Sequence, residues 1–261
     1  MATGFVHTYG PYVLVAGGSY GLGAAFAEGI ARRGVNLVII ARNESQLTAT
    51  ADRLRATYGV NVIAVVADMA DFEDVRTQLS RLEVAIGLLV YDAAHAPIGR
   101  FEDVPEDQLA QAVSVNVRTP LLLAKLLSGP MIERGRGGIV LMSSLAGGQG
   151  SPNIAAYAAT KAFNAILAEG LWKELKPRGI DVLACLAGAI LTPGYREAEG
   201  GRPAPGTLEA AEVAEQTLRA LGKGPMVVPG VVNKVGRFVL TRLLSRRAAI
   251  DIMAKNTGGL S

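Results

Sequence analysis

The sequence predicts an α/β protein built on a single parallel, doubly wound sheet with helices on both faces. Short apolar runs rich in Val, Ile and Leu alternate along the chain with amphipathic stretches of helix length. The apolar runs are almost continuous, which is typical of strands buried on both faces. Strands and helices that alternate in this way form right-handed βαβ units and therefore a parallel sheet.

Seven strands and seven helices are expected. No internal repeat or low-complexity linker divides the chain, so we expect one domain over residues 1–261. The first residues, with His7, are expected to form a flexible arm. The predicted strands are 12–16, 35–41, 60–67, 86–91, 138–142, 180–186 and 225–229, and the predicted helices are 21–33, 44–58, 72–82, 106–133, 155–176, 208–221 and 232–249.

Composition narrows the functional classes. Of the 261 residues, 50% are hydrophobic and 19% are charged, so the chain can bury a large core and is not of the disordered class. Its one cysteine, Cys185, excludes an intrachain disulfide framework and a cysteine-rich zinc site, and we predict no metal site. We read no secretory signal and no run of 18 apolar residues, and we expect a cytoplasmic location.

Positive charge collects near the C-terminus. Residues 219–255 hold eight Lys or Arg and one acid, a net charge of +7, whereas the whole chain carries +3. One interpretation is an anionic partner, in particular a membrane surface contacted by the helix near 232–249, where residues 238–247 mix apolar and basic side chains. The other is a helix whose charges face water and whose apolar side packs on the domain. No recognition motif accompanies the charge, so we predict no nucleic-acid binding.

Residues 193–207 interrupt the pattern. This stretch reads PGYREAEGGRPAPGT and holds seven Gly or Pro in fifteen residues, which excludes a regular helix or strand. It follows the sixth predicted strand, at the carboxyl edge where ligands of open α/β sheets bind. It is either a lid over a substrate or a plain surface loop.

A glycine turn joins the first predicted strand to the first helix. Gly17, Gly21 and Gly23 stand in the spacing GxxxGxG. Glycines allow a tight turn and a close approach of the backbone to a pyrophosphate, and the N-terminus of the following helix attracts the phosphate charge. The sequence therefore predicts a Rossmann-like dinucleotide site, to which Ser19, Tyr20 and Leu22 of the same turn also belong.

The second predicted strand ends at Ala41-Arg42, without the acid that binds the ribose of NAD. A guanidinium there matches a 2′-phosphate, so we expect NADP(H) as the cofactor. The alternative is that Arg42 is a solvated residue before a helix. After the third strand, Asp68 with Met69 is expected at the adenine, and the alternative for Asp68 is a helix cap or turn.

Four polar residues form a candidate catalytic group. Tyr157 and Lys161 are four residues apart on a predicted helix and share one face. Ser144 follows the fifth strand, again at the carboxyl edge. Asn116 lies inside a long predicted helix, where an amide is unfavourable unless its side chain has a task.

These motifs together resemble the short-chain dehydrogenase/reductases with a Ser–Tyr–Lys active site, over residues 10–230. The matching segments are AGGSYGLG, the Asp68 turn, SVNVRTP around Asn116, IVLMSS ending at Ser144, and YAATKAF from Tyr157. The segment from GLGAAF to RNESQL is similar to the branch of the 17β-hydroxysteroid dehydrogenases and 3-oxoacyl-CoA reductases. The resemblance implies a homodimer or homotetramer.

The resemblance also implies roles. Tyr157 would be the general acid/base, Lys161 would favour its phenolate and hold the nicotinamide ribose, Ser144 would orient the substrate oxygen, and Asn116 would hold a water that links Lys161 to solvent. Further positions follow from the same likeness. They are Ala93, Gly188, Ile190 and Thr192 at the cofactor, which Tyr157 would also contact, and Leu145, His95 and Tyr195 at the substrate.

Three segments depart from the family pattern. Ala16 replaces a threonine before the glycine turn, Asp92 and Ala94 alter the usual NNAG after the fourth strand, and Ala187 replaces the proline before Gly188. We expect these changes to affect cofactor affinity more than catalysis. The sequence thus favours an NADP(H)-dependent reductase of a ketone, or the reverse reaction, on a small hydrophobic substrate. The alternative is a cofactor-binding sensor or scaffold protein with little or no turnover.

Overall fold

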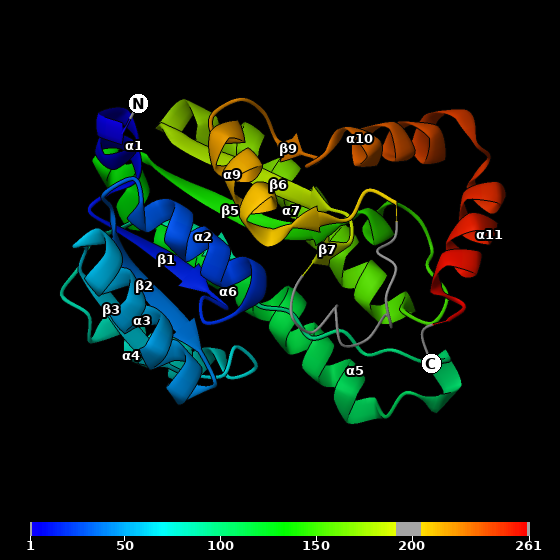
Figure 1. Ribbon diagram of the computed structural model, residues 1–261, viewed down its shortest axis with the longest axis horizontal. Coiled ribbons are helices and arrows are strands. Elements are labelled where there is room, and N and C mark those ends of the chain that lie inside the picture. Colours follow the sequence, from blue (N-terminus) through cyan, green and yellow to red (C-terminus); the bar gives the residue numbers. More distant parts are fainter. Residues whose placement is uncertain (1, 192–204, 260–261) are drawn as a thin grey trace.

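A computed structural model describes residues 2–191 and 205–259. Its centre is a parallel sheet of seven strands in the order β3-β2-β1-β4-β5-β6-β9, which confirms the predicted fold class (Figure 1). The strand order reverses between β1 and β4, and such a switch point opens a crevice at the carboxyl ends. The strands are β1 (Tyr12–Ala16), β2 (Asn36–Ala41), β3 (Val62–Val66), β4 (Ile86–Tyr91), β5 (Gly137–Ser144), β6 (Ile180–Ala187) and β9 (Met226–Val227).

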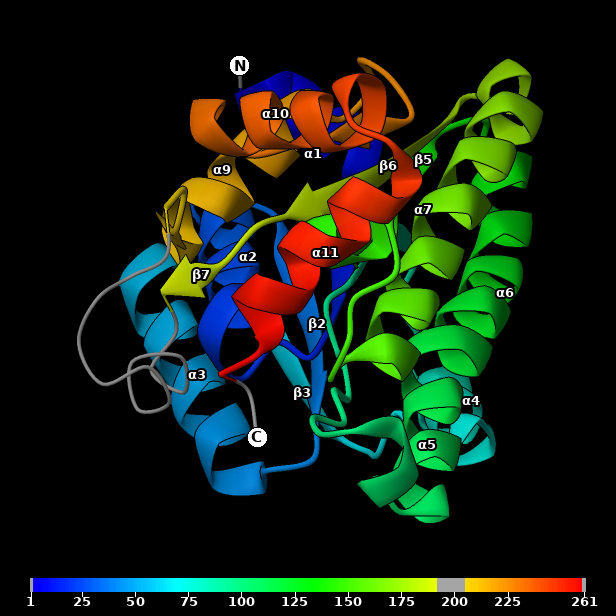
Figure 2. The same ribbon diagram turned by 90° about the vertical axis from the view of Figure 1, so that its right-hand side faces the viewer.

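Helices cover both faces of the sheet, as Figure 2 shows. Alternate residues of each strand point to opposite faces, so Val13 and Val15 of β1 join one buried cluster while Leu14 and Ala16 join the other. The first cluster packs against α2 (Gly21–Ala31), α3 (Glu44–Tyr58) and α9 (Ala210–Ala220). The second packs against α4 (Phe72–Ser80), α6 (Thr119–Arg134) and α7 (Ala155–Leu175).

The long helix predicted over 106–133 is one continuous rod with a local irregularity. It consists of α5 (Glu106–Val113), a π-helical turn (Ser114–Arg118) and α6. π-turns inside α-helices are frequent at functional sites, since the wider turn redirects side chains. This one carries Asn116.

Two predictions at the chain ends were wrong. The expected N-terminal arm is helical over α1 (Ala2–Tyr9), because aromatic residues anchor it to the domain. The Tyr9 hydroxyl donates a hydrogen bond of 2.6 Å to Asp181 Oδ2 at the start of β6. The guanidinium carbon of Arg33 lies 5.4 Å from the centre of the Phe5 ring.

The last predicted helix, 232–249, is in fact two helices. A π-helical turn (Val239–Leu243) follows α10 (Val231–Phe238), and the backbone then becomes extended at Leu244. The Ser245 side chain accepts a hydrogen bond from the Ala248 N–H and so caps the new helix, α11 (Arg246–Thr257).

The predicted helix 208–221 begins two residues late. Its first residues form β8 (Leu208–Glu209), which pairs with β7 (Ile190–Leu191) beside the main sheet. Within the residues that the structure describes, no helix is long and apolar enough to span a membrane.

Candidate active site

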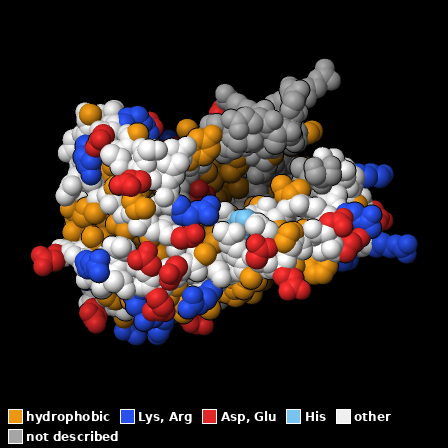
Figure 3. Space-filling model, turned by 90° about the horizontal axis from the view of Figure 1, so that it is seen from below, with side chains coloured by type: hydrophobic (Ala, Val, Ile, Leu, Met, Phe, Trp, Pro, Cys, Tyr) orange, Lys and Arg blue, Asp and Glu red, His pale blue; other side chains and the backbone are white. Residues whose placement is uncertain are grey.

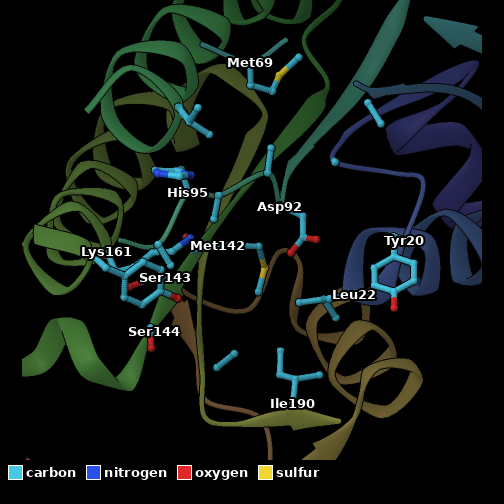
Figure 4. Close-up of a pocket in the computed structure, with 18 of the residues that line it drawn as sticks. Tyr20, Leu22, Met69, Asp92, His95, Met142, Ser143, Ser144, Lys161 and Ile190 are labelled. Carbon is cyan, nitrogen blue, oxygen red and sulfur yellow. The ribbon is translucent and has the colours of Figure 1, made fainter. Parts of the chain in front are cut away.

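A cavity of about 620 Å³ opens at the carboxyl ends of the central strands. Figure 3 looks onto this hollowed side of the molecule, where acidic and basic side chains lie together at the rim. The close-up in Figure 4 shows side chains from both halves of the sheet pointing into it. The lining residues are Gly17, Tyr20, Leu22, Ile40, Ala41, Arg42, Asp68, Met69, Asp92, Ala93, Ala94, His95, Ala96, Gln111, Val115, Met142, Ser143, Ser144, Tyr157, Lys161, Ala187, Gly188 and Ile190.

Two positions in the turn after β1 and the start of α2 leave room only for glycine. Gly17 has φ +89°, and a Cβ there would lie 2.8 Å from the Ala93 nitrogen. A Cβ on Gly23 would lie 2.0 Å from the Gly17 carbonyl oxygen. The N-cap residue of α2, Tyr20, makes no capping bond with its side chain, and the positive end of the helix dipole lies at this turn. A positively polarised glycine turn of this shape fits the phosphates of a dinucleotide.

Asp92 lines the cavity next to the same turn. It directly follows β4, and its carboxylate lies beside the backbone N–H of Gly23. Burial raises the pKa of this carboxyl to about 6, although the Lys161 ammonium and the Gly23 N–H both favour the charged form. The sequence marked Asp92 as a departure from the family but did not predict it as a site residue; its place directly after β4, at the switch point, was the available signal.

Tyr157, Lys161 and Ser144 converge on one side of the cavity. Tyr157 and Lys161 both project from α7, and the Lys161 nitrogen lies 5.5 Å from the centre of the Tyr157 ring. The Lys161 ammonium donates a hydrogen bond of 3.1 Å to the Met142 carbonyl of β5, and the residue is only 3% exposed. Ser144 ends β5, so strand and helix together fix the three groups.

Burial moves the pKa values of these groups toward their neutral forms. It raises the pKa of the Tyr157 phenol to about 12; the Ser144 hydroxyl opposes this shift and the Asp92 carboxylate adds to it. It lowers the pKa of the Lys161 ammonium to about 8, against the attraction of Asp92. The protein by itself therefore keeps Tyr157 protonated at neutral pH, as an acid that can give its proton to a substrate.

Asn116 is completely buried in the π-turn, and both the oxygen and the nitrogen of its carboxamide have hydrogen-bond partners. Its oxygen accepts from the His95 N–H at 2.8 Å, while its nitrogen donates to the His95 carbonyl at 2.7 Å and to Thr160 Oγ1 at 3.0 Å. Its backbone carbonyl accepts a bond of 3.0 Å from Asn164. Asn116 thus ties the loop after β4 to α7, one residue before Lys161.

Arg42 and Asp68 lie at the open end of the cavity. Their closest nitrogen and oxygen atoms are 3.7 Å apart, and their side chains are 64% and 42% exposed. The Asp68 carboxylate also accepts from the Ala70 N–H, as a turn residue does. Asp68 is therefore a turn residue that also lines the cavity, and its contact with an adenine stays a prediction.

Most of the predicted site residues meet at this cavity. Five of the predicted residues that the structure describes do not line the cavity: Ser19, Gly21 and Gly23 of the turn, Asn116 of the π-turn, and Leu145. Thr192, Tyr195 and most of the predicted lid fall outside the described residues. Cys185 is buried in the core. Sequence reasoning missed several lining residues, mostly apolar and without a motif: Ile40, Gln111, Val115, Met142, Ser143 and Ala187.

Comparison with known proteins decides the family. The model of the family described as short chain dehydrogenase matches residues 11–201. The chain belongs to this family. Its members are oxidoreductases that use a nicotinamide cofactor, which agrees with the glycine turn and the Tyr157–Lys161 pair described above.

Curated relatives lie in the predicted branch. The 7beta-hydroxysteroid dehydrogenase of Collinsella aerofaciens is 31% identical over 232 residues, 87% of this chain and 88% of the relative. The very-long-chain 3-oxoacyl-CoA reductase of Emericella nidulans is 35% identical over 179 residues, which are 66% of this chain but only 52% of that enzyme.

Solved structures agree with the same assignment. A 7beta-hydroxysteroid dehydrogenase structure superposes with a TM-score of 0.90 at 28% identity, over 96% of this chain and 99% of the other. A short-chain dehydrogenase from Sphingobium yanoikuyae in complex with NADPH gives a TM-score of 0.75 at 33% identity, over 84% of this chain and 87% of the other.

Proposed function

We propose that the protein reduces a ketone to a secondary alcohol, or catalyses the reverse reaction, on a small hydrophobic substrate with NADP(H). The observation that carries this proposal is the convergence of Ser144, Tyr157 and Lys161 in the cavity that also holds the glycine turn. A proton donor, an oxygen-orienting hydroxyl and a place for the dinucleotide then share one space.

The reaction assigns one task to each side chain. The bound nicotinamide supplies the hydride to the carbonyl carbon. The Tyr157 hydroxyl gives its proton to the carbonyl oxygen, which the Ser144 hydroxyl holds by a hydrogen bond. One hydride and one proton are thus added across the C=O bond. The buried positive charge of Lys161, 5.5 Å from the Tyr157 ring, stabilises the phenolate that remains.

Asn116 serves this reaction from a distance. Its carboxamide clamps the His95 backbone to Thr160, and Thr160 adjoins Lys161 on α7. We propose that this clamp keeps Lys161 in place and that Asn116 holds a water through which Lys161 passes the proton to solvent.

Arg42 supports the preference for NADP(H). It stands at the end of β2, at the cavity mouth, with its guanidinium largely in water. A planar fork of donors matches a 2′-phosphate, whereas Ala41, the last residue of β2, offers no carboxylate to receive a ribose hydroxyl. The relative from Sphingobium yanoikuyae, which is 33% identical, holds NADPH.

A relative that matches most of this chain, a 7beta-hydroxysteroid dehydrogenase, favours bulky alicyclic ketones such as steroids as the substrate class. Met142, Val115 and Ile190 give the cavity apolar walls beside Ser144. His95 lines the same region. The Nε2 atom of its ring lies 2.7 Å from the side-chain oxygen of Gln108, and the imidazole is a polar group beside these apolar walls. A 7beta-hydroxysteroid dehydrogenase structure matches almost the whole chain.

A homodimer or homotetramer is also proposed. Helices α6 and α7 lie side by side on one face of the sheet (Figure 2) and expose large apolar side chains. Leu121 and Leu126 of α6 are 39% and 38% exposed, and Ile166 of α7 is 67% exposed. Association of these faces would remove that apolar area from water.

The test is NADPH consumption against a panel of steroidal, cyclic, aryl and 3-oxoacyl ketones, with NADH in parallel. We expect turnover with NADPH on bulky ketones that disappears in Tyr157→Phe. Equal turnover with NADH would overturn the role of Arg42. Turnover that survives in Tyr157→Phe would overturn the proposed chemistry.

A binding protein without turnover is the second candidate. Asp92 and Ala94 alter the cavity wall next to the glycine turn, and the negative charge of Asp92 disfavours the Tyr157 phenolate. Tight NADPH binding, measured by titration, with no turnover across the whole panel would favour this candidate.

A further inference from the structure

The C-terminal arm, residues 231–257, comprises α10, the π-turn and α11. Figure 1 shows α10 and α11 at the edge of the molecule, outside the helix layers that cover the sheet. The arm is attached beside the active site. Arg246 donates a hydrogen bond of 2.7 Å to the Gly148 carbonyl, four residues after Ser144, and Asn153 donates one of 3.0 Å to the Thr257 carbonyl.

The apolar side of α10 faces outward. Val231, Val235 and Phe238 are spaced four and three residues apart, so they share one face, and they are 74%, 57% and 57% exposed. The buried residue of this helix is polar: Asn233 donates to the carbonyls of Gly206 and Pro229. This is the reverse of an ordinary surface helix, which buries its apolar stripe.

The exposed apolar surface extends beyond α10. Val232 is 57% exposed on the same helix, and Leu243 at the end of the π-turn is 65% exposed. The prediction that the apolar side of this segment packs on the domain is therefore wrong for Phe238 and Leu243. Their exposure needs an explanation other than core formation.

Basic residues surround this surface. The arm holds six Lys or Arg and a single acid, Asp251, a net charge of +5. Lys234 lies one turn before Phe238 at the edge of the apolar face, and Arg242 directly precedes Leu243. Arg246 and Arg247 are exposed at the start of α11.

We propose that this face of the C-terminal arm binds an anionic lipid surface. An amphipathic helix with an exposed apolar face and basic neighbours lies in the plane of a membrane, with its apolar residues at the acyl boundary and its cations at the headgroups. The partner chemistry follows from the charge. A symmetric contact with a second copy would bring the same basic residues against each other, whereas anionic headgroups neutralise them. The proposal does not depend on the reaction that the active site catalyses.

The test is flotation of the full chain with vesicles of phosphatidylcholine alone and of phosphatidylcholine mixed with phosphatidylserine. At low salt, we expect the protein to bind the mixed vesicles strongly and the neutral ones weakly. High salt shortens the range of the attraction between the basic residues and the anionic headgroups to a few ångströms, so it should release the protein. No binding to the mixed vesicles at low salt would overturn the proposal, and so would binding that ignores phosphatidylserine.

Variants locate the contact. Phe238→Asp removes an apolar residue from the membrane-facing side and adds a negative charge. The double change Arg242→Gln/Arg247→Gln removes two positive charges that attract anionic headgroups. Each is expected to weaken partition into the mixed vesicles by about tenfold or more. The matched controls are Val66→Asp at the end of β3 and Arg76→Gln/Arg81→Gln in and directly after α4, which change exposed residues outside both the arm and the α6–α7 face. Controls that lose as much binding as the arm variants would overturn the assignment.

Light scattering tests the competing occupant, and thermal unfolding verifies that each variant is folded. If the unaltered chain does not bind lipid and Phe238→Asp reduces its oligomeric size, a second copy covers the apolar face of α10 and the proposal is overturned. If Phe238→Asp loses lipid binding at unchanged size and unfolding temperature, the proposal stands.

Discussion

The two halves of the cavity hold their polar groups in different ways. The catalytic half, formed by β5, α7 and the π-turn, keeps Asn116 at 0% and Lys161 at 3% exposure, each with buried hydrogen-bond partners. In the nucleotide half, the side chains of Arg42 and Asp68 are 64% and 42% exposed. A change in the buried half leaves partners unsatisfied, while water replaces what is lost in the exposed half. We therefore expect the effects of substitution to decline from the first half to the second.

The largest effect is expected for Tyr157→Phe. The variant removes the hydroxyl that we propose gives its proton to the substrate and leaves the aromatic ring in place. Its kcat for ketone reduction should fall by about 10²–10⁴-fold, the usual worth of a general acid. The measurement is steady-state NADPH oxidation on the best substrate of the panel.

The dissociation constant of NADPH is the control for this variant. It should change little, because the glycine turn and Arg42 are untouched. A parallel loss of cofactor affinity and turnover would mean that Tyr157 acts through the shape of the site and not through its proton.

Asn116→Ala is expected to cost stability as well as activity. It removes three hydrogen bonds that the Asn116 carboxamide makes, with the His95 N–H, the His95 carbonyl and the Thr160 hydroxyl. Unsatisfied groups of this kind cost about 1–3 kcal/mol each, and we expect the free energy of unfolding to fall by about 2–4 kcal/mol. Denaturant unfolding measures it.

A comparison with Asn43→Ala sharpens this prediction. Asn43 is exposed and caps α3 by accepting from the Gln46 N–H, so its loss should cost only about 1 kcal/mol. Equal losses for the two variants would contradict the contrast drawn between buried and exposed amides.

Arg42→Ala is expected to act on one cofactor only. Charge-assisted bonds to phosphate contribute about 1.5–3 kcal/mol, so NADPH affinity should fall by about 10- to 100-fold while NADH affinity stays unchanged. Isothermal titration with both cofactors measures this difference. Arg53→Ala is the control, because Arg53 is exposed and paired with Glu28 away from the cavity. A similar loss for both cofactors would mean that Arg42 does not read the 2′-phosphate.

Much of the fold could be predicted from the sequence because buried strands leave a direct signal. The limits of β1 and β4 agree with the predicted 12–16 and 86–91, since both are uninterrupted apolar runs. The ends of the chain were harder to predict. Whether α1 docks depends on the bond from Tyr9 to Asp181, 172 residues away, which no local pattern encodes.

The site shows the same division. Tyr157 and Lys161 could be predicted because their spacing and their family motif coincide. The π-turn around Asn116 could not, because it becomes visible only when its partners at His95 and Thr160 are known. Met142 and Ala187 escaped prediction because an apolar residue at a strand end has the same pattern whether it lines a cavity or packs in a core.

Asp92→Asn is the smallest expected effect and joins the two halves, because Asp92 contacts the glycine turn and faces Lys161. The pKa of the Asp92 carboxyl in the folded chain is about 6, above its value of about 3.9 in an unfolded chain. The folded protein then binds more protons between about pH 4 and 6, so ionisation of Asp92 lowers the free energy of unfolding as the pH rises through that interval.

An asparagine keeps an oxygen for the Gly23 N–H without the charge. The variant should therefore be more stable than the unaltered protein by about 1–2 kcal/mol above pH 6, and equal to it near pH 4. Denaturant unfolding at several pH values measures the gap, with the exposed Asp251→Asn as a control that should follow the unaltered protein throughout. A variant less stable at pH 7 would show that the attraction between Asp92 and Lys161 outweighs the cost of burying the carboxylate, and that charge, as well as packing, holds the two halves together.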